Sequence, residues 1–135
     1  MYLGSCVCGE VELVIQGGIH GIIHCHCSRC RKNSGTAYAT NGFVNVNEFT
    51  LTKGKDSLAI YSTNPGRKRH FCQKCGSSVY SSNDQDPSRN RIRLGILDSD
   101  IIERPISHNF VTSKANWEDL DVDLPRNEEF EIGRA

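Results

Sequence analysis

The residues best able to do chemistry in this chain are its seven cysteines, a large number for 135 residues. They form three groups that lie far apart in the sequence. The groups are Cys6-x-Cys8, Cys25-x-Cys27-x-x-Cys30 and Cys72-x-x-Cys75. The first residues show neither a charged nor an apolar export segment, so we expect a cytoplasmic location, where disulfides are rare. An odd number of cysteines also cannot be closed by internal disulfides alone, which favours metal binding or thiol chemistry.

Two of the groups together predict a closed zinc site. Zinc takes four tetrahedral ligands in structural sites, and two cysteines one or two residues apart can bind one ion from a tight turn. A glycine directly follows each of these pairs and lets the backbone turn sharply, so that amides can point toward the thiolates. These glycines are Gly9 and Gly76. The predicted ligands are Cys6, Cys8, Cys72 and Cys75.

The remaining three cysteines predict a second, open site. Catalytic zinc has three protein ligands and keeps a fourth position for water or substrate, which matches Cys25, Cys27 and Cys30 on one short loop. Spacing alone leaves two alternatives open. Cys25 and Cys30 could instead join Cys72 and Cys75, or a histidine could fill the fourth position and make both sites structural. The histidine candidates are His24, His26, His70 and His108.

Basic residues flank two of the cysteine groups. A cation beside a thiolate stabilises the ionised form, and arginine can bind a substrate carboxylate through two parallel hydrogen bonds. The flanking bases are Arg29, Arg31, Lys32, Arg67, Lys68, Arg69 and Lys74. The whole chain has 16 basic and 16 acidic side chains, however, and no stacking aromatics alternate with the basic patch. We therefore expect no nucleic-acid partner.

Short apolar runs separated by turn signals predict a mainly β fold. The expected strands lie at residues 10–15, 19–24, 36–46, 49–52, 58–61, 78–82, 92–97 and 108–111. A turn or two of helix is expected at residues 28–34 and 116–120.

The length of 135 residues suits one domain, and we expect a single zinc domain over residues 1–135. Seven acidic residues follow position 117 and predict a solvated C-terminal tail, with the core at about residues 4–126. No segment approaches the ~20 apolar residues of a membrane span, so we expect no membrane partner.

Several segments, taken in order, resemble the glutathione-dependent formaldehyde-activating enzyme (Gfa) family, also called the centromere-protein-V/Gfa domain. The segments are residues 4–11 (GSCVCGEV), 25–35 (CHCSRCRKNSG), 69–77 (RHFCQKCGS), 97–98, 108–117 (HNFVTSKANW) and 124–125. Together they extend over nearly the whole chain. The ordered set is far more specific than any one motif.

The resemblance implies a β-tent fold of short antiparallel strands around zinc knuckles, similar to that of the Rab-accessory zinc proteins. It implies two Zn²⁺ ions per chain, a structural ion and a second, less fully occupied one. The structural ligands are Cys6, Cys8, Cys72 and Cys75, and the ligands of the second, catalytic zinc are Cys25, Cys27 and Cys30. It also implies a carbon–sulfur lyase that acts on glutathione or another small thiol adduct.

Two other classes of function stay open at this point. A zinc-stabilised binding module without catalytic activity would need no open metal position. A thiol redox enzyme with Cys27 or Cys30 as nucleophile would need a thiol outside the zinc sites, and the division into four and three leaves none. Because His26 lies between two predicted ligands, we expect its side chain to point away from the metal, either beside the ligands or in solvent, and to take no part in the chemistry.

Overall fold

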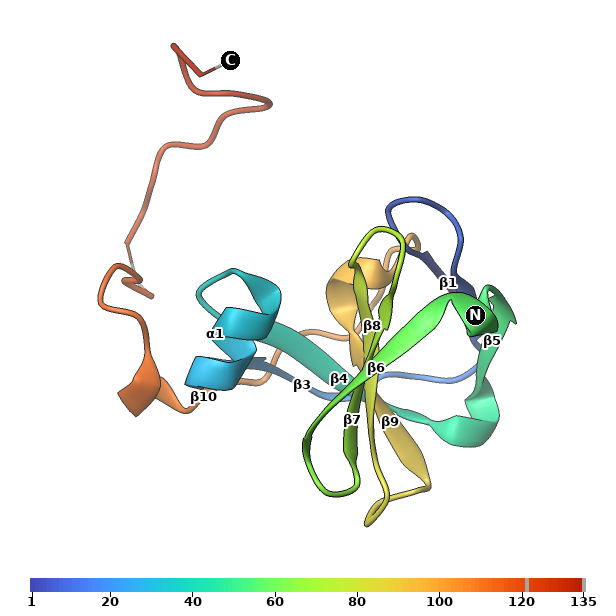
Figure 1. The fold of residues 1–135 in the computed structure, drawn as a ribbon. Helices are drawn as coiled ribbons and strands as arrows, with labels where there is room; N and C mark the ends of the chain where they lie inside the picture. The colour runs from blue at the N-terminus through green and yellow to red at the C-terminus, as the bar shows by residue number, and fades with distance from the viewer. Residues whose placement is uncertain (121, 135) are drawn as a thin grey trace.

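The computed structural model describes residues 1–120 and 122–134, which consist mainly of short strands (Figure 1). The strands are β1 (Tyr2–Ser5), β2 (Glu12–Ile15), β3 (His20–Cys25), β4 (Ala39–Asn45), β5 (Phe49–Lys53), β6 (Leu58–Asn64), β7 (Arg67–Cys72), β8 (Ser78–Asn83), β9 (Arg89–Arg93) and β10 (Ser107–Asn109). The helices are α1 (Ser28–Ser34) and the 3-10 helices η1 (Val46–Glu48), η2 (Lys55–Ser57), η3 (Leu94–Ile96) and η4 (Val111–Ser113). The predicted mainly β fold is confirmed.

The strands form two sheets. β1, β2 and β5 make a small antiparallel sheet, and the large sheet has the order β10-β3-β4-β9-β8-β7-β6. Neighbours in the large sheet are antiparallel, except that β10 runs parallel to β3. Pro65 and Gly66 join β6 to β7 in a hairpin, as the turn chemistry of proline and glycine favours.

The core lies where the two sheets pack together. Leu13 and Ile15 on β2 form one cluster with Ile22, Val44 and Ile92 from the large sheet. Each of these side chains is at most 1% exposed. Since burial of one such side chain stabilises a fold by about 1.5–3 kcal/mol, this cluster is the main apolar contribution that holds the sheets together.

Helix α1 confirms the helix predicted at residues 28–34, and its two ends explain its length. At the start, Sγ of Cys27 caps the helix by accepting a hydrogen bond from the N–H of Cys30 at 3.3 Å. At the end, Gly35 adopts a left-handed conformation with φ 73°, and its N–H donates to the carbonyl of Arg31. The cysteine loop is therefore continuous with the first turn of α1.

Two predicted elements are wrong, and two strands lack a sequence signal. The strand predicted at residues 92–97 begins earlier, at Arg89, and ends at Arg93, where the chain enters η3. Residues 116–120 form turns rather than a helix. β1 and β7, with the sequences YLGS and RKRHFC, do not alternate apolar and polar residues in the way that indicates a strand.

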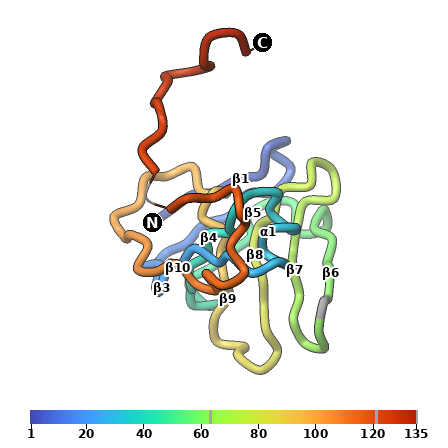
Figure 2. Tube along the Cα trace, turned by 90° about the vertical axis from the view of Figure 1, so that its left-hand side faces the viewer, coloured from blue at the N-terminus to red at the C-terminus, as the bar shows by residue number. Residues whose placement is uncertain are grey.

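The acid-rich C-terminal segment lies away from the sheets. Residues 122–134 contain no helix or strand, and both views show them leading away from the strands (Figure 1, Figure 2). Among the described residues, no helix is both long enough and apolar enough to cross a membrane.

Candidate metal centres and the pocket beside them

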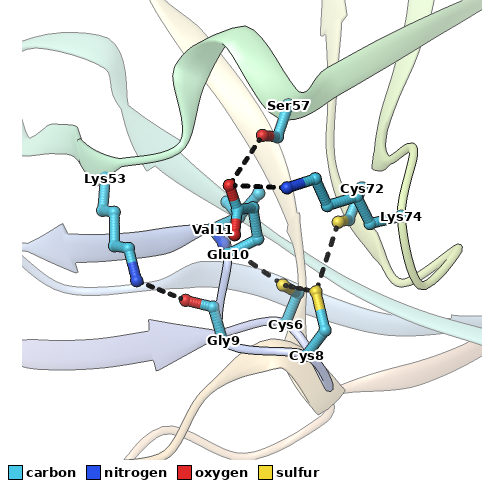
Figure 3. A network of polar contacts seen from close by, with 9 residues as sticks. All are labelled: Cys6, Cys8, Gly9, Glu10, Val11, Lys53, Ser57, Cys72 and Lys74. Carbon is cyan, nitrogen blue, oxygen red and sulfur yellow. Dashed lines mark hydrogen bonds and ion pairs between the residues drawn. The ribbon is translucent and has the colours of Figure 1, made fainter.

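The four cysteines of the first predicted site come together from one connection in each of the two sheets. Cys6 and Cys8 lie between β1 and β2, whereas Cys72 ends β7 and Cys75 lies in the turn to β8. The four Sγ atoms lie within 4.8 Å of one another, and Sγ of Cys8 is 3.6 Å from that of Cys6 and 3.8 Å from that of Cys72 (Figure 3). Tetrahedral zinc with Zn–S bonds of about 2.3 Å places its sulfurs about 3.8 Å apart, so this donor set fits zinc.

In each cysteine pair, the glycine that follows the second cysteine donates a backbone hydrogen bond to the first cysteine. The N–H of Gly9 donates to the carbonyl of Cys6 at 3.0 Å, and the N–H of Gly76 donates to the carbonyl of Cys72 at 2.7 Å. Both glycines are left-handed, with φ of 76° and 78°, and both have open space where a side chain would lie. Glycine is therefore required here by the turn and not by packing.

Polar contacts fix the first of these turns to the rest of the fold (Figure 3). Glu10 forms an ion pair with Lys74 at 3.1 Å and accepts a hydrogen bond from the Ser57 hydroxyl at 3.4 Å. Lys53 donates to the carbonyl of Gly9 at 3.1 Å. Lys74, one of the predicted flanking bases, is thus engaged with Glu10.

The four packed thiols cannot all ionise easily without a cation. Hydrogen bonds from the Ser77 hydroxyl and N–H lower the pKa of Cys75 to about 5. At Cys8 the N–H of Glu10 lowers the pKa, but desolvation and the neighbouring thiols outweigh it and raise the pKa to about 11. Ionisation of one thiol disfavours ionisation of the neighbouring thiols because like charges repel. A divalent metal ion removes this conflict, which is a second reason why the group fits a metal.

The other three cysteines form a separate sulfur group at the start of α1. Cys25 ends β3, Cys27 caps α1 and Cys30 lies in its first turn. Their Sγ atoms lie within 4.8 Å of one another, and in the described parts of the chain no histidine nitrogen or carboxylate oxygen completes the group. Burial raises the pKa of Cys25 to about 12. The structure thus groups the cysteines as four and three, and Cys25 and Cys30 do not lie with Cys72 and Cys75.

The histidine candidates make other contacts. The side chain of His26 is fully buried, and its Nε2 lies 2.9 Å from Nδ1 of His108. The rings of His24, His26 and His108 all pack against Tyr38, so that these residues form an aromatic cluster beside the three-cysteine loop. His70 lies apart on β7 and stacks on a tyrosine ring.

The three-cysteine group forms part of the wall of a pocket with a volume of about 600 Å³. Strands β3, β4, β7, β8 and β9 supply most of the remaining wall. The basic lining residues are Arg29, Arg67, Lys68, Arg69, Arg91 and Arg93. None of the described lining residues is acidic. The size is typical of a small-molecule site, and the charge favours an anionic ligand.

The pocket only partly matches the bases predicted from the sequence. Of the three bases beside the three-cysteine group, Arg29 lines the pocket, whereas Arg31 and Lys32 do not. Arg91 and Arg93 line it and are not among the predicted residues. Their signal is the alternation RNRIR in residues 89–93, which places an arginine at every second position of β9.

Phe110 lines the same pocket in a strained conformation. Its φ is 59°, and it is the one described residue other than glycine with a positive φ. For a bulky side chain this conformation costs about 1–3 kcal/mol and is found mostly at functional sites. The preceding carbonyl, of Asn109, accepts the N–H of His26 at 2.9 Å. The strain therefore lies where β10 meets the three-cysteine loop.

The sequence profile of the glutathione-dependent formaldehyde-activating enzymes matches residues 1–113. The chain belongs to this Gfa family. A Halomonas elongata protein, provisionally named a glutathione-dependent formaldehyde-activating enzyme, is 29% identical over 127 residues, which cover 87% of this Gfa chain and 80% of that protein. A Podospora anserina protein with the same provisional name is 30% identical over 78 residues, or 56% of this chain and 37% of the relative.

A solved structure shares the fold of this Gfa-family chain. The crystal structure of a Rhodobacter sphaeroides protein matches with a TM-score of 0.64 and 22% identity. The match covers 78% of this chain and 98% of that protein's chain. At this level of identity the likeness concerns the fold alone.

Proposed function

We propose that this protein is a zinc-dependent carbon–sulfur lyase that joins a small thiol, such as glutathione, to an aldehyde carbon and releases it again. The observation that carries the proposal is that one pocket contains both a three-sulfur group and cationic walls. The sulfur group supplies three ligands where zinc takes four, and arginines suit carboxylate-bearing thiols. The family profile and the provisional names of the relatives support the same activity.

Both sulfur groups are proposed to bind zinc. The structural ligands are Cys6, Cys8, Cys72 and Cys75, and the ligands at the catalytic site are Cys25, Cys27 and Cys30. Zinc at the catalytic site would supply a Lewis acid that favours the ionised form of a substrate thiol near neutral pH. Both groups need reduced thiols, which supports a cytoplasmic location.

The proposed reaction is balanced without a redox partner. The substrate thiol loses its proton to solvent, its sulfur forms a bond to the carbonyl carbon, the π electrons of the carbonyl move to the oxygen, and that oxygen takes a proton from solvent. In reverse, the hydroxyl loses its proton to solvent, the carbonyl π bond re-forms, and the carbon–sulfur bond breaks with its electron pair returning to sulfur. The chain's own contribution is to bind the anionic groups of the thiol with the pocket arginines and to restrict water with the rings of Phe43 and Phe110.

Cobalt substitution tests the open metal position without relying on activity. We expect glutathione to change the visible absorption of cobalt at the three-cysteine site, because a further sulfur enters its coordination shell. Cys30→Ser should abolish the change, while the bands of the four-sulfur site in the same protein remain as an internal control. A spectrum that does not respond to millimolar glutathione would contradict the lyase proposal and favour a zinc-stabilised binding module.

Product formation provides a second test. The zinc-loaded protein should accelerate the formation of S-hydroxymethylglutathione from formaldehyde and glutathione, followed by NMR. Cys30→Ser should lose this acceleration, and Arg126→Gln, a change of the highly exposed Arg126 side chain in the C-terminal segment, should retain it. Equal rates with and without the wild-type protein would contradict formaldehyde as the electrophile.

A further inference from the structure

Four arginines of the pocket have no acidic partner in the described part of the chain. Among the described residues, no carboxylate forms an ion pair with Arg67, Arg69, Arg91 or Arg93. Nearby bases are paired, namely Lys68 with Asp84 at 3.9 Å, Lys74 with Glu10 at 3.1 Å and Arg89 with Asp86 at 2.6 Å. Lys68 also lines the pocket, so the lack of acidic partners among the described residues is a property of these four arginines rather than of every base in the pocket.

Strand geometry concentrates these four charges on one face of the large sheet. The arginines on β7 are two residues apart, as are those on β9, so the side chains of each pair emerge on the same face. Arg69 lies opposite Ser81 on β8, and Ser81 lies opposite Arg91. The two arginine pairs are therefore on the two strands that flank β8. Ile92 points to the other face and is buried in the core.

Neutral amides hold the two arginines nearest α1. Nη1 of Arg69 and Nη2 of Arg93 both donate to Oδ1 of Asn33, at 3.1 and 3.2 Å, and Nη1 of Arg93 donates to Oδ1 of Asn41. The guanidinium groups of Arg69 and Arg93 are thus held close together, and a bound anion would reduce the repulsion between their charges.

The described lining residues include no carboxylate that could pair with a positively charged group. Glutathione carries an ammonium group as well as its two carboxylates, and an ammonium group taken out of water needs a compensating partner. The side-chain oxygens of the lining belong only to amides and hydroxyls, those of Ser28, Asn41, Asn64, Ser81, Ser82 and Asn109. The pocket therefore favours a ligand whose charged groups are all negative.

We propose that this pocket selects a small polyanionic thiol, one that carries a phosphate or several carboxylates and no ammonium group. The inference rests on the proposed function for the thiol itself and narrows the substrate class. The sulfur of such a ligand lies at the three-cysteine group, and its anionic groups lie along the arginines of β7 and β9. Glutathione is then a weaker ligand of the same site.

Two thiols that differ by one phosphate test the proposal. 4′-Phosphopantetheine and pantetheine share the thiol arm, and the phosphate adds a charge of about −1.5 to −2 at pH 7. Isothermal titration calorimetry on the zinc-loaded protein measures their affinities and that of glutathione. We expect 4′-phosphopantetheine to bind at least about 10-fold more tightly than pantetheine or glutathione. This difference in affinity should decrease as the salt concentration rises from about 0.05 to about 0.5 M, because the contacts are ionic.

Variants that remove one arginine charge test whether the phosphate binds at the arginines of β7 and β9. Arg67→Gln and Arg91→Gln should each weaken 4′-phosphopantetheine about 5- to 10-fold and leave pantetheine unchanged. Arg126→Gln is the matched control, because its side chain is 91% exposed and lies in the C-terminal segment; it should change neither affinity. Thermal melts followed by circular dichroism show whether each variant is folded.

The polyanion proposal and the lyase proposal fail in different ways. Inorganic pyrophosphate contains no thiol, so its binding, weakened by Arg67→Gln and Arg91→Gln, supports the polyanion pocket whether or not a thiol reaches the metal. Equal affinities for pantetheine and 4′-phosphopantetheine, or a phosphate advantage that survives both substitutions, would overturn the polyanion proposal. A cobalt spectrum that does not respond to thiols overturns the lyase proposal and the thiol part of the present one, whereas the binding of pyrophosphate tests the polyanion pocket separately.

Discussion

Individual cysteines differ in what their loss removes from the molecule. Cys72 is fully buried and belongs to the group that joins the β1–β2 connection to the β7–β8 connection. Cys30 belongs to a group confined to the end of β3 and the start of α1. In a structural zinc site the free energy of metal binding is also folding free energy. The same substitution, cysteine to serine, should therefore have different effects at the two positions.

Cys72→Ser should unfold the protein, whereas Cys30→Ser should leave it folded. Structural zinc sites contribute about 10 kcal/mol or more, which equals or exceeds the usual net stability of about 5–15 kcal/mol. Thermal unfolding followed by circular dichroism measures both variants against the wild type. A Cys72→Ser protein that kept the wild-type Tm would contradict the structural role of the four-sulfur group.

Phe110→Gly should weaken ligand binding without loss of stability. Glycine adopts the φ of 59° at this position without steric cost, and the Phe110 side chain is 64% exposed, so little packing is lost. We expect the free energy of unfolding to stay unchanged or to rise by up to about 1 kcal/mol. Val111→Gly is the control: this exposed neighbour has no positive φ, and the change should cost about 1 kcal/mol. A larger loss for Phe110→Gly than for Val111→Gly in urea unfolding would show that residue 110 is not strained.

The cysteine groups could be anticipated from the sequence, but the arginine face could not. Ligand spacing is a local property of a turn, so Cys6-x-Cys8 and Cys72-x-x-Cys75 can be recognised as knuckles before any fold is known. The arginines of β7 and β9 meet only because both strands pair with β8. That information lies in the register of the sheet, which no single segment carries.

At the scale of elements, a turn between strands supports the first cysteine knuckle. Gly54 connects β5 to η2 and has φ 78°. A Cβ atom at this position would lie 2.0 Å from the carbonyl oxygen of Glu10. The backbone of this turn therefore packs directly against the residues that follow Cys8.

Gly54→Ala should destabilise the fold more than Gly35→Ala. Both glycines are left-handed, with φ of 78° and 73°, but Gly35 has open space around it. The left-handed conformation alone costs alanine about 1–2 kcal/mol, which is the loss expected for Gly35→Ala. Gly54→Ala adds a clash with backbone atoms and should cost at least about 3 kcal/mol. Chemical denaturation measures both, and equal losses would mean that the turn does not press on the knuckle.

Most strands could be predicted because apolar alternation and turn residues are local signals. β7 is the instructive exception, since its sequence RKRHFC has almost no apolar content. It becomes a strand because β6 and β8 pair with it on both sides, which is tertiary context overriding propensity. The same context makes its two arginines part of the pocket wall.

At the scale of the whole molecule, the two sulfur groups tie the chain in different ways. The four-sulfur group joins a connection of the small sheet to a connection of the large sheet, through residues as far apart as Cys8 and Cys72. The three-sulfur group lies within residues 25–30 and links no distant segments. We therefore expect the fold to depend on the first group, and the second group to exchange a metal or a ligand while the sheets stay intact.

Stepwise removal of zinc tests this division of roles. A chelator added in small increments should first take the zinc held by Cys25, Cys27 and Cys30, because that ion has one protein ligand fewer. The circular dichroism signal should stay constant while this first equivalent of zinc leaves. It should change only when the ion of the four-sulfur group leaves, since binding of that ion contributes to the folding free energy. Cys30→Ser should lack the first phase and retain the second at an unchanged chelator concentration. If the β-sheet signal fell together with the first zinc released, either the four-sulfur group would release its ion first or the three-sulfur group would hold the fold, and the proposed division of roles would be wrong.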